Sequence, residues 1–280
     1  MNPPQKPLSQ WQRLLKNAGT WQGSFTQISP QGHVLNDVRT EVELTPTDGG
    51  KAMHQEVRRY PENESPQIQT LDYRSLNRAI LFFESGAFSH GSMQWGPFSD
   101  FGAELGLIEG DRRLRLLQLF KKNELQPLTL IREGLQDTNF ATRPKLNIAD
   151  LLGTWQGSAT TQYADLRPET TSTTQLVIER TGSSQIRQTI TLGAGIPATS
   201  SVGRLESDRI LFQSGAQHVQ VLLLPDGASA TCPTAITPRQ PIFLEAGWLT
   251  DSHTRQRLIR SYDATGAWTS LTLVTERKRS

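Results

Sequence analysis

The hexapeptide Gly-Thr-Trp-Gln-Gly-Ser occurs twice in this chain, at residues 19–24 and again at residues 153–158. Three further pairs of similar segments follow in the same order: LFFESGAF with LFQSGAQ, RLRLLQLF with RQRLIRSY, and LTLIRE with LTLVTE. The order is kept while the spacing drifts, as happens when loops change length in a duplicated domain. We therefore predict two domains, residues 1–135 and residues 146–280. Because residues 147–280 begin and end with complete motifs, we expect the second domain to fold alone.

Composition limits what these domains can do. Lys and Arg number 29 and Asp and Glu number 27, so the formal net charge is +2, which is too small to indicate a nucleic-acid partner. The single cysteine, Cys232, excludes a disulfide within the chain and favours a reducing compartment. No segment has the apolar length of a signal peptide or of a membrane span. We expect a cytoplasmic protein whose oligomeric state the sequence leaves open.

Most of the chain has the pattern of β-strands. Residues 170–192 are β-branched and alternating around a turn at Gly182, and residues 35–61 form a hairpin pattern with Asp48, Gly49 and Gly50 at the tip. Helical spacing is confined to residues 8–19, with Ser9 as the N-cap, and to the short segment 147–153. Because closure removes unpaired strand edges, long meanders favour barrels. The predicted fold is all-β: two tandem, antiparallel up-and-down β-barrels, each preceded by a short helix.

The Gly-x-Trp of each hexapeptide, placed after a short helix and before a long meander, resembles the lipocalin and wider calycin barrels. This resemblance implies that Trp21 and Trp155 close the floors of the barrels and bind nothing. It also implies that an arginine of the last strand lies across each indole, a cation–π contact worth roughly 0.5–2 kcal/mol. Arg132 is the candidate over Trp21, and Arg277 is the candidate over Trp155.

The double copy and the closing segment 257–277 also resemble a double-barrel, lipocalin-like family of cyanobacteria and chloroplasts. The resemblance extends over nearly the whole chain. It is distant to the S- and T-type lyases, calycin barrels that attach bilins to phycobiliproteins. Such a resemblance implies a fold, whereas function depends on the site.

Signatures of catalysis and of metal binding are missing from the sequence. It contains no Gly-x-Ser-x-Gly, no His-Glu-x-x-His and no phosphate-binding loop. One cysteine cannot form a thiolate zinc site, and the five histidines show no metal-ligand spacing. We therefore predict no cofactor, no metal and no catalytic residue, and a binding protein is favoured over an enzyme.

A duplicated Arg-x-Arg is the most specific candidate for a binding site. Arg113 and Arg115 share one face of their strand, as do Arg255 and Arg257. In one interpretation these arginines lie on a solvated outer face and the interleaved leucines point inward. In the other, the guanidinium groups project into each barrel and bind an acidic group of a ligand.

The segment after strand 81–90 adds further candidates. His90 lies near a predicted barrel mouth, where it is either a hydrogen-bonded strand residue or a ligand contact. Trp95 and Phe98 follow in an irregular loop, which either packs on the barrel's core or forms a lid over an apolar ligand.

The predicted function is the binding of a small, largely apolar and possibly anionic ligand, such as a bilin, an isoprenoid or a fatty acid. The predicted ligand-binding residues are Arg113, Arg115, His90, Trp95, Phe98, Arg255 and Arg257. Two alternatives remain open: a chromophore lyase or isomerase of the calycin type, and a non-enzymatic assembly or structural factor with filled barrels.

Overall fold

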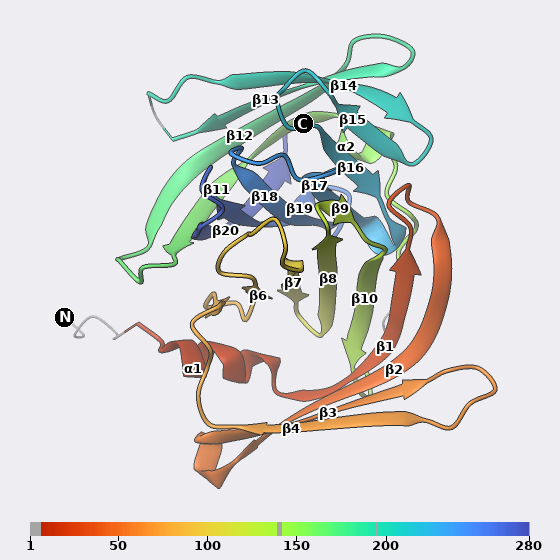
Figure 1. The fold of residues 1–280 in the computed structure, drawn as a ribbon, viewed down its shortest axis with the longest axis vertical. Coiled ribbons are helices and arrows are strands. Elements are labelled where there is room, and N and C mark those ends of the chain that lie inside the picture. The colour runs from red at the N-terminus through yellow and green to blue at the C-terminus, as the bar shows by residue number, and fades with distance from the viewer. Residues whose placement is uncertain (1–6, 139–141, 194, 280) are drawn as a thin grey trace.

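The computed structural model describes residues 7–138, 142–193 and 195–279, and its regular structure is dominated by antiparallel strands. Helix α1 (Gln10–Leu14) and the 3-10 turn η1 (Leu15–Asn17) precede the sheet of the first half, and α2 (Ile148–Leu151) precedes that of the second. In Figure 1 the second half, green to blue, lies above the first, red to yellow-green. None of the described helices is long and apolar enough to cross a membrane. The prediction of an all-β chain with two barrel-like domains is confirmed.

The first half forms a curled sheet that does not close. Its strand order is β4-β3-β2-β1-β10-β8-β7-β6-β5, with β9 paired to β8, so β4 and β5 are its two edges. The predicted hairpin is present, with Asp48–Gly50 at the turn between β2 and β3. The strands of this sheet are β1 (Gly19–Ile28), β2 (Val34–Thr47), β3 (Ala52–Tyr60), β4 (Gln67–Tyr73), β5 (Ile80–Phe82), β6 (Phe88–Gly91), β7 (Phe101–Glu109), β8 (Arg112–Lys121), β9 (Glu124–Leu125) and β10 (Leu128–Leu135).

The second half forms a closed barrel in which each strand pairs with the next and β20 pairs with β11. The two halves differ where β14 and β15 pair across a tight turn, whereas residues 74–79 separate β4 from β5. The barrel strands are β11 (Gly153–Tyr163), β12 (Thr170–Arg180), β13 (Gln185–Leu192), β14 (Thr199–Glu206), β15 (Arg209–Phe212), β16 (Val219–Leu223), β17 (Ala228–Pro233), β18 (Ile242–Leu249), β19 (Thr254–Tyr262) and β20 (Trp268–Lys278).

The repeated hexapeptide builds the first strand of each half. Trp21 is 1% exposed and Trp155 is fully buried. Each indole N–H donates a hydrogen bond of 2.9 Å to a carbonyl in the helical segment before it, that of Asn17 or that of Leu151. The tryptophan therefore fixes the helix to the floor of the barrel in both halves.

The second glycine of the hexapeptide allows a close approach between backbones. A Cβ added at Gly23 would lie 1.8 Å from the carbonyl oxygen of Arg132, and one at Gly157 would lie 1.9 Å from that of Thr275. Real Cβ atoms do not come this close to backbone, so the neighbouring last strand requires glycine here.

The cation over Trp21 belongs to Arg113, not to Arg132 as predicted. The Arg113 Cζ lies 4.4 Å from the ring centroid of Trp21. Arg132 is paired with Ser24 rather than with Trp21, and its Nη2 donates to Ser24 Oγ at 3.1 Å and Thr26 Oγ1 at 2.8 Å. These residues lie on the outer face of β1, because side chains of a strand alternate between faces.

The same correction applies to the second half. The Lys278 Nζ lies 5.3 Å from the ring centroid of Trp155, and Lys278 is directly opposite Trp155 in the register of β11 and β20. Arg277 is opposite Gln156, so its side chain points to the other face.

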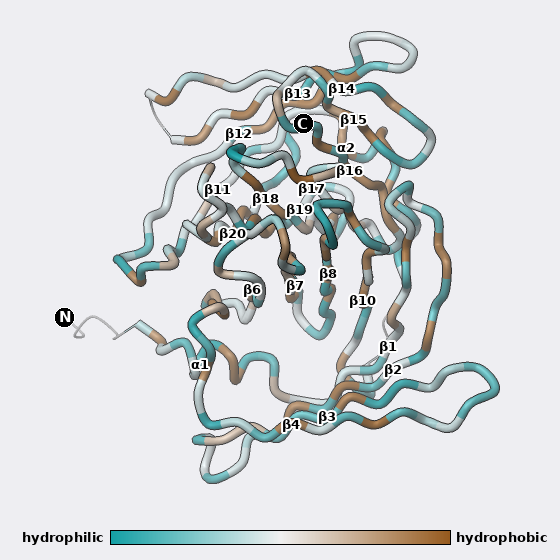
Figure 2. The backbone as a smooth tube through the Cα atoms, in the orientation of Figure 1, coloured by the Kyte–Doolittle hydropathy of each residue, from teal (hydrophilic) through white to brown (hydrophobic). Residues whose placement is uncertain are grey.

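The largest hydrophobic cluster among the described residues lies between the two halves. It combines residues of β7, β8 and β10 with residues of β16 to β20, and Figure 2 shows apolar stretches on both sides of this contact. Leu114 and Leu116 of β8 are fully buried in it. Leu114 and Leu116, which alternate with the arginines along β8, therefore face the second half. Arg113 and Arg115 face the inside of the first sheet.

A buried arginine also joins the two halves. Arg260 on β19 is 0% exposed and donates to the carbonyl oxygens of Ala79, Gly91 and Ser92 in the first half, at 3.1–3.3 Å. Its guanidinium lies 3.7 Å from the ring centroid of Trp268. Backbone carbonyls and an indole face thus stabilise this charge in the place that a carboxylate would usually take.

Candidate functional site

The inside of the first half-barrel contains a cavity of about 360 Å³, here called cavity A. This volume lies in the usual range for small-molecule sites. Strands β2 to β8 and the helical segment before β1 all contribute to its lining. Its apolar wall consists of Leu14, Val42, Leu44, Leu71, Tyr73, Leu76, Ile80, Phe82 and Phe88, and its polar residues are Asn17, Gln55, Ser75, Asn77, His90, Glu104, Arg113 and Arg115.

Helix α1 joins the two unpaired edges of the first sheet at cavity A. Trp11 packs edge-on against Tyr73 of β4, with ring centroids 6.1 Å apart. On the other edge, Gln10 accepts from the Phe82 N–H at 2.6 Å and donates to the Phe82 carbonyl at 3.1 Å. The Gln10 side chain thus satisfies backbone groups that a neighbouring strand would otherwise pair.

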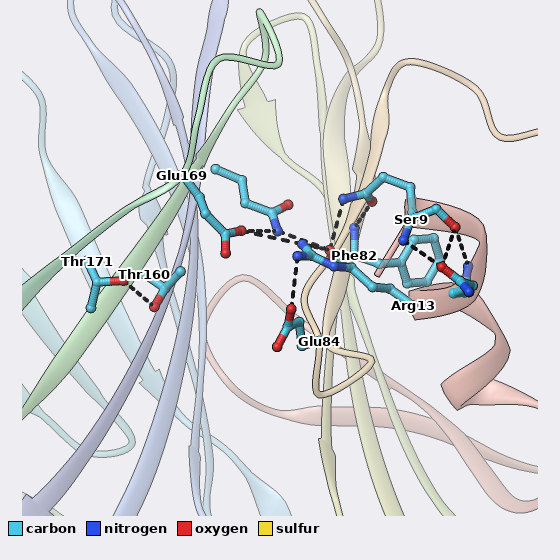
Figure 3. A network of polar contacts seen from close by, with 10 residues as sticks. Ser9, Arg13, Phe82, Glu84, Thr160, Glu169 and Thr171 are labelled. Atoms are coloured by element: carbon cyan, nitrogen blue, oxygen red, sulfur yellow. Dashed lines mark hydrogen bonds and ion pairs between the residues drawn. The ribbon is translucent and has the colours of Figure 1, made fainter. Parts of the chain in front are cut away.

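The same Phe82 carbonyl connects α1 to the second half. Arg13 donates to this oxygen at 3.2 Å and Gln162 of β11 donates to it at 3.1 Å (Figure 3). Arg13 also lies 3.4 Å from carboxylate oxygens of both Glu84 and Glu169, the latter in the second half. The position of α1 over cavity A is therefore set partly by the second barrel.

The predicted arginines of the first half lie at the floor of cavity A, and each is paired with glutamate. Arg113 Nε is 2.7 Å from Glu133 Oε2, and Arg115 binds both oxygens of Glu133, at 3.1 and 2.9 Å. Arg115 Nη1 is 2.7 Å from Glu104 Oε1. Two positive and two negative charges give this cluster a formal charge of zero.

For Glu133 and Arg115 the ion pairs outweigh the cost of burial, whereas for Arg113 burial prevails and lowers the pKa. Burial by itself would raise the pKa of Glu133, but Arg113 and Arg115 lower it to about 2. Burial would lower the pKa of Arg115, but Glu133 and Glu104 raise it above its ordinary value. Glu133 and Arg115 therefore stay ionised at neutral pH.

His90 lies beside this cluster, opposite Glu104 in the register of β6 and β7. The His90 side chain is partly exposed, and the burial of its remainder lowers its pKa, while Glu104 opposes this effect and Arg260 adds to it. Since the unperturbed value is about 6.5, the imidazole is mostly neutral at pH 7. The structure thus brings three of the predicted residues, Arg113, Arg115 and His90, to one cavity, and their role in binding stays a prediction.

The second barrel repeats this arrangement around a cavity of about 350 Å³, here called cavity B, which Arg255 and Arg257 line. Arg257 binds both oxygens of Glu245, at 2.9 and 2.8 Å. Arg255 lies 3.5 Å from Glu276, which faces it across β19 and β20. In each half, therefore, two arginines on one strand are balanced by a glutamate on each neighbouring strand.

Sequence reasoning missed these glutamates, although the repeat contained a signal for them. Glu133 and Glu276 end the matching segments LTLIRE and LTLVTE. Glu104 and Glu245 occupy equivalent positions on β7 and β18, two residues before the glycine that faces Arg115 or Arg257. A buried Arg-x-Arg requires carboxylate partners, and duplicated acidic residues are the natural candidates.

Trp95 and Phe98 do not line cavity A, contrary to the lid interpretation. The Trp95 N–H donates to the Gly266 carbonyl at 2.8 Å, and the side chain packs on the core between the halves. Phe98 is fully exposed, at 101%. The bridge between Gln94 and Ala267 holds this loop against the second half and away from the cavity.

The described residues contain no group of three His, Cys, Asp or Glu side chains arranged to hold a metal ion. The thiol of Cys232 is buried, which raises its pKa to about 12. It is therefore protonated at neutral pH and a poor nucleophile.

Comparisons with known proteins agree with the two-part organisation. Residues 8–138 match the family model described as "Domain of unknown function (DUF3598), N-terminal". Residues 142–279 match the model described as "Biogenesis factor required for ATP synthase 1, C-terminal domain". A crystal structure of a DUF3598 protein of unknown function from Nostoc punctiforme is 44% identical, with a TM-score of 0.92 over 98% of this chain and 100% of that one. The chain belongs to the DUF3598 family.

A further match is distant. An S-type phycobiliprotein lyase from Guillardia theta is 13% identical, with a TM-score of 0.40 over 47% of this chain and 90% of that chain. Comparison with curated proteins gave no match.

Proposed function

We propose that this DUF3598 protein binds a small, largely apolar molecule in cavity A. The observation that carries the proposal is an apolar-walled cavity of about 360 Å³ with Glu104, Arg113 and Arg115 in its lining. Together with the buried Glu133 behind them, these residues form a cluster whose formal charge is zero. A bare pair of arginines would favour an anionic head group. Because both are already neutralised, we expect a neutral polar group to be preferred over an anionic one.

Two probes of similar shape test this preference. N-phenyl-1-naphthylamine is neutral, and 1-anilinonaphthalene-8-sulfonate has a similar aromatic framework with one negative charge. Both fluoresce on entering an apolar site, so titration of each probe gives its affinity. We expect the neutral probe to bind more tightly.

A variant at the cavity lining shows whether cavity A is the site. Ser75 is exposed and lines cavity A from the segment between β4 and β5, so Ser75→Trp fills space there with little effect on the core. Affinity for the neutral probe should fall by about tenfold, which is 1.4 kcal/mol. Arg78→Trp is the control, because Arg78 is exposed on the same segment and does not line the cavity. Tighter binding of the sulfonate, or no effect of Ser75→Trp, would contradict the proposal.

A second candidate is a role in assembling a protein complex. It is favoured by the match of residues 142–279 to a domain of a factor whose description names ATP synthase biogenesis. Deleting the gene in its host should then lower the amount of assembled ATP synthase on native gels while its separate subunits persist. Normal assembly in the deletion strain would exclude this role.

A further inference from the structure

The first half-barrel contains a second cavity, of about 390 Å³, that the proposed function does not use. It is here called cavity C. Phe25, Val38, Val57, Leu117 and Ile131 form its apolar wall. Apart from Pro61, its remaining lining is polar and partly exposed, so cavity C is an open pocket.

Cavities A and C are two ends of one interior. Along β2 the inward face passes from Val42, which lines cavity A, to Val38, which lines cavity C. Along β4 it passes from Tyr73 in cavity A to Gln67 in cavity C. Because residues an even number apart share a strand face, the two cavities lie along the same concave surface.

The two cavities meet at one ion pair. Arg115 and Glu104 line both cavities, and Arg113 and Leu117 flank Arg115 on β8, one in each cavity. Arg115 is held by Glu133 as well as by Glu104, and with Arg113, which also binds Glu133, these four residues carry no net formal charge. The pair offers guanidinium N–H donors and, on the partly exposed Glu104, carboxylate acceptors.

Two buried polar atoms near this junction lack a hydrogen-bond partner among the described residues. One is Nη2 of Arg113, whose side chain is 2% exposed. The other is the hydroxyl of Thr40, which is buried on the same face of β2 as Val38 and Val42. Buried polar atoms without partners cost roughly 1–3 kcal/mol each, so the interior beside the junction is polar as well as buried. Thr40 lines neither cavity, so the ligand contacts are those of Arg115 and Glu104.

We infer that the ligand of the first barrel is an elongated, neutral molecule with two apolar arms and a hydrogen-bonding group near its middle. One arm occupies cavity A, the other occupies cavity C, and an amide or hydroxyl lies at Arg115 and Glu104. An amide carbonyl accepts from a guanidinium and its N–H donates to a carboxylate, so one neutral group serves both partners. This inference rests on the proposed binding in cavity A.

Two amides serve as probes that distinguish the binding of a ligand with two arms from the binding of a ligand with one arm. N-octyloctanamide has a seven-carbon chain on the carbonyl of its amide and an eight-carbon chain on the nitrogen, and N-methyloctanamide has the same amide with only the long chain on the carbonyl. Ser75→Trp blocks cavity A and Leu117→Trp blocks cavity C. Leu119→Trp is the matched control, because Leu119 is on the same face of β8 and lines neither cavity. Thr129→Trp blocks cavity C from β10 if Leu117→Trp does not fold.

Isothermal titration with the full chain gives the affinity of each amide. We expect each blocking variant to weaken the two-armed amide by about tenfold, while the one-armed amide is weakened only by variants that block one of the two cavities. If Leu117→Trp and Thr129→Trp leave the two-armed amide unaffected while Ser75→Trp weakens it, the ligand is confined to cavity A and the inference is wrong. If Ser75→Trp affects neither amide, the proposed function itself fails.

Discussion

At the scale of single residues, Glu133 determines the electrostatics of the first barrel. Its side chain has no exposed surface and binds Arg113 and Arg115 together, while Arg113 also lies over the ring of Trp21. One carboxylate thus connects the floor tryptophan to the residue between cavities A and C. Removing one partner of a buried pair typically costs about 3–5 kcal/mol, because the remaining charge stays buried.

The low pKa of Glu133 in the folded chain predicts that the protein loses stability in acid. Its pKa is about 2 in the folded chain and near its ordinary value of 4.5 in the unfolded chain. Since the folded pKa is the lower one, the stabilisation is complete above pH 4.5 and is lost as the pH falls towards 2. At 1.36 kcal/mol per pKa unit, this group should contribute about 3 kcal/mol to the free energy of unfolding.

Urea denaturation between pH 7 and pH 2 measures this contribution. Glu133→Gln should be less stable at pH 7 and should flatten the fall in stability between pH 4.5 and 2. Glu62→Gln, which is exposed in the turn after β3, should keep the profile of the unmodified chain. An unchanged acid profile in Glu133→Gln would show that other groups govern the loss.

At the scale of elements, the sequence correctly predicted the helix cap, turn and strand features that depend on local pattern. The Ser9 cap, the hairpin at Asp48–Gly50 and the antiparallel meander follow from turn residues and alternation, and all are present. The pairing of Arg113 with Trp21 in place of Arg132 could not be predicted, because it depends on register. A shift of one residue moves a side chain to the opposite face, and only the pairing of Trp21 with Leu135 settles which face Arg132 takes.

The open edge of the first sheet also depends on contacts that are distant in sequence. Repetition predicted closure in both halves, but β5 has only three residues and Gln10 satisfies the N–H and the carbonyl of Phe82. A strand edge whose backbone groups are already hydrogen-bonded to a side chain needs no neighbouring strand. The helical spacing of residues 8–19 predicted helix α1, but it did not predict that α1 lies across the open edges of the first sheet.

The contacts of the Gln10 side chain with the Phe82 backbone therefore predict a local loss of protection when that side chain is removed. In Gln10→Ala the Phe82 N–H loses its acceptor, which should cost about 1–3 kcal/mol and speed hydrogen exchange at that amide. Gln12→Ala removes only the capping contact with Ser9 and should leave exchange at Phe82 slow. Equal exchange rates at Phe82 in both variants would mean that α1 as a whole, rather than Gln10, protects the edge.

At the scale of the whole molecule, each sheet uses its two faces for different purposes. On β8, Arg113 and Arg115 face the cavities, and Leu114 and Leu116, which alternate with them, pack on the second half. A shift of β8 at the contact between halves would therefore also move the charged floor of cavity A. The duplicated barrels are coupled through one strand, in addition to the contact of Arg13 with Glu169.

This shared core leads us to expect that the second half is not independent, contrary to the expectation from its complete motifs. Residues 142–280 expressed alone would expose Trp248, Leu258 and Tyr262, each at most 2% exposed in the full chain. Arg260 would also lose its carbonyl partners in the first half. Apolar patches of this kind drive association, so the fragment should aggregate or bind apolar dyes strongly.

Co-expression of residues 1–141 with residues 142–280 provides the matched control, because it restores the same interface without the covalent link. The two pieces should purify together as a soluble complex in size-exclusion chromatography. In that complex, Arg260→Leu should weaken the association of the pieces, since the carbonyls of Ala79, Gly91 and Ser92 lose their donor while the apolar contact remains. A monomeric 142–280 fragment with the thermal stability of the full chain would show that the second barrel folds without its neighbour.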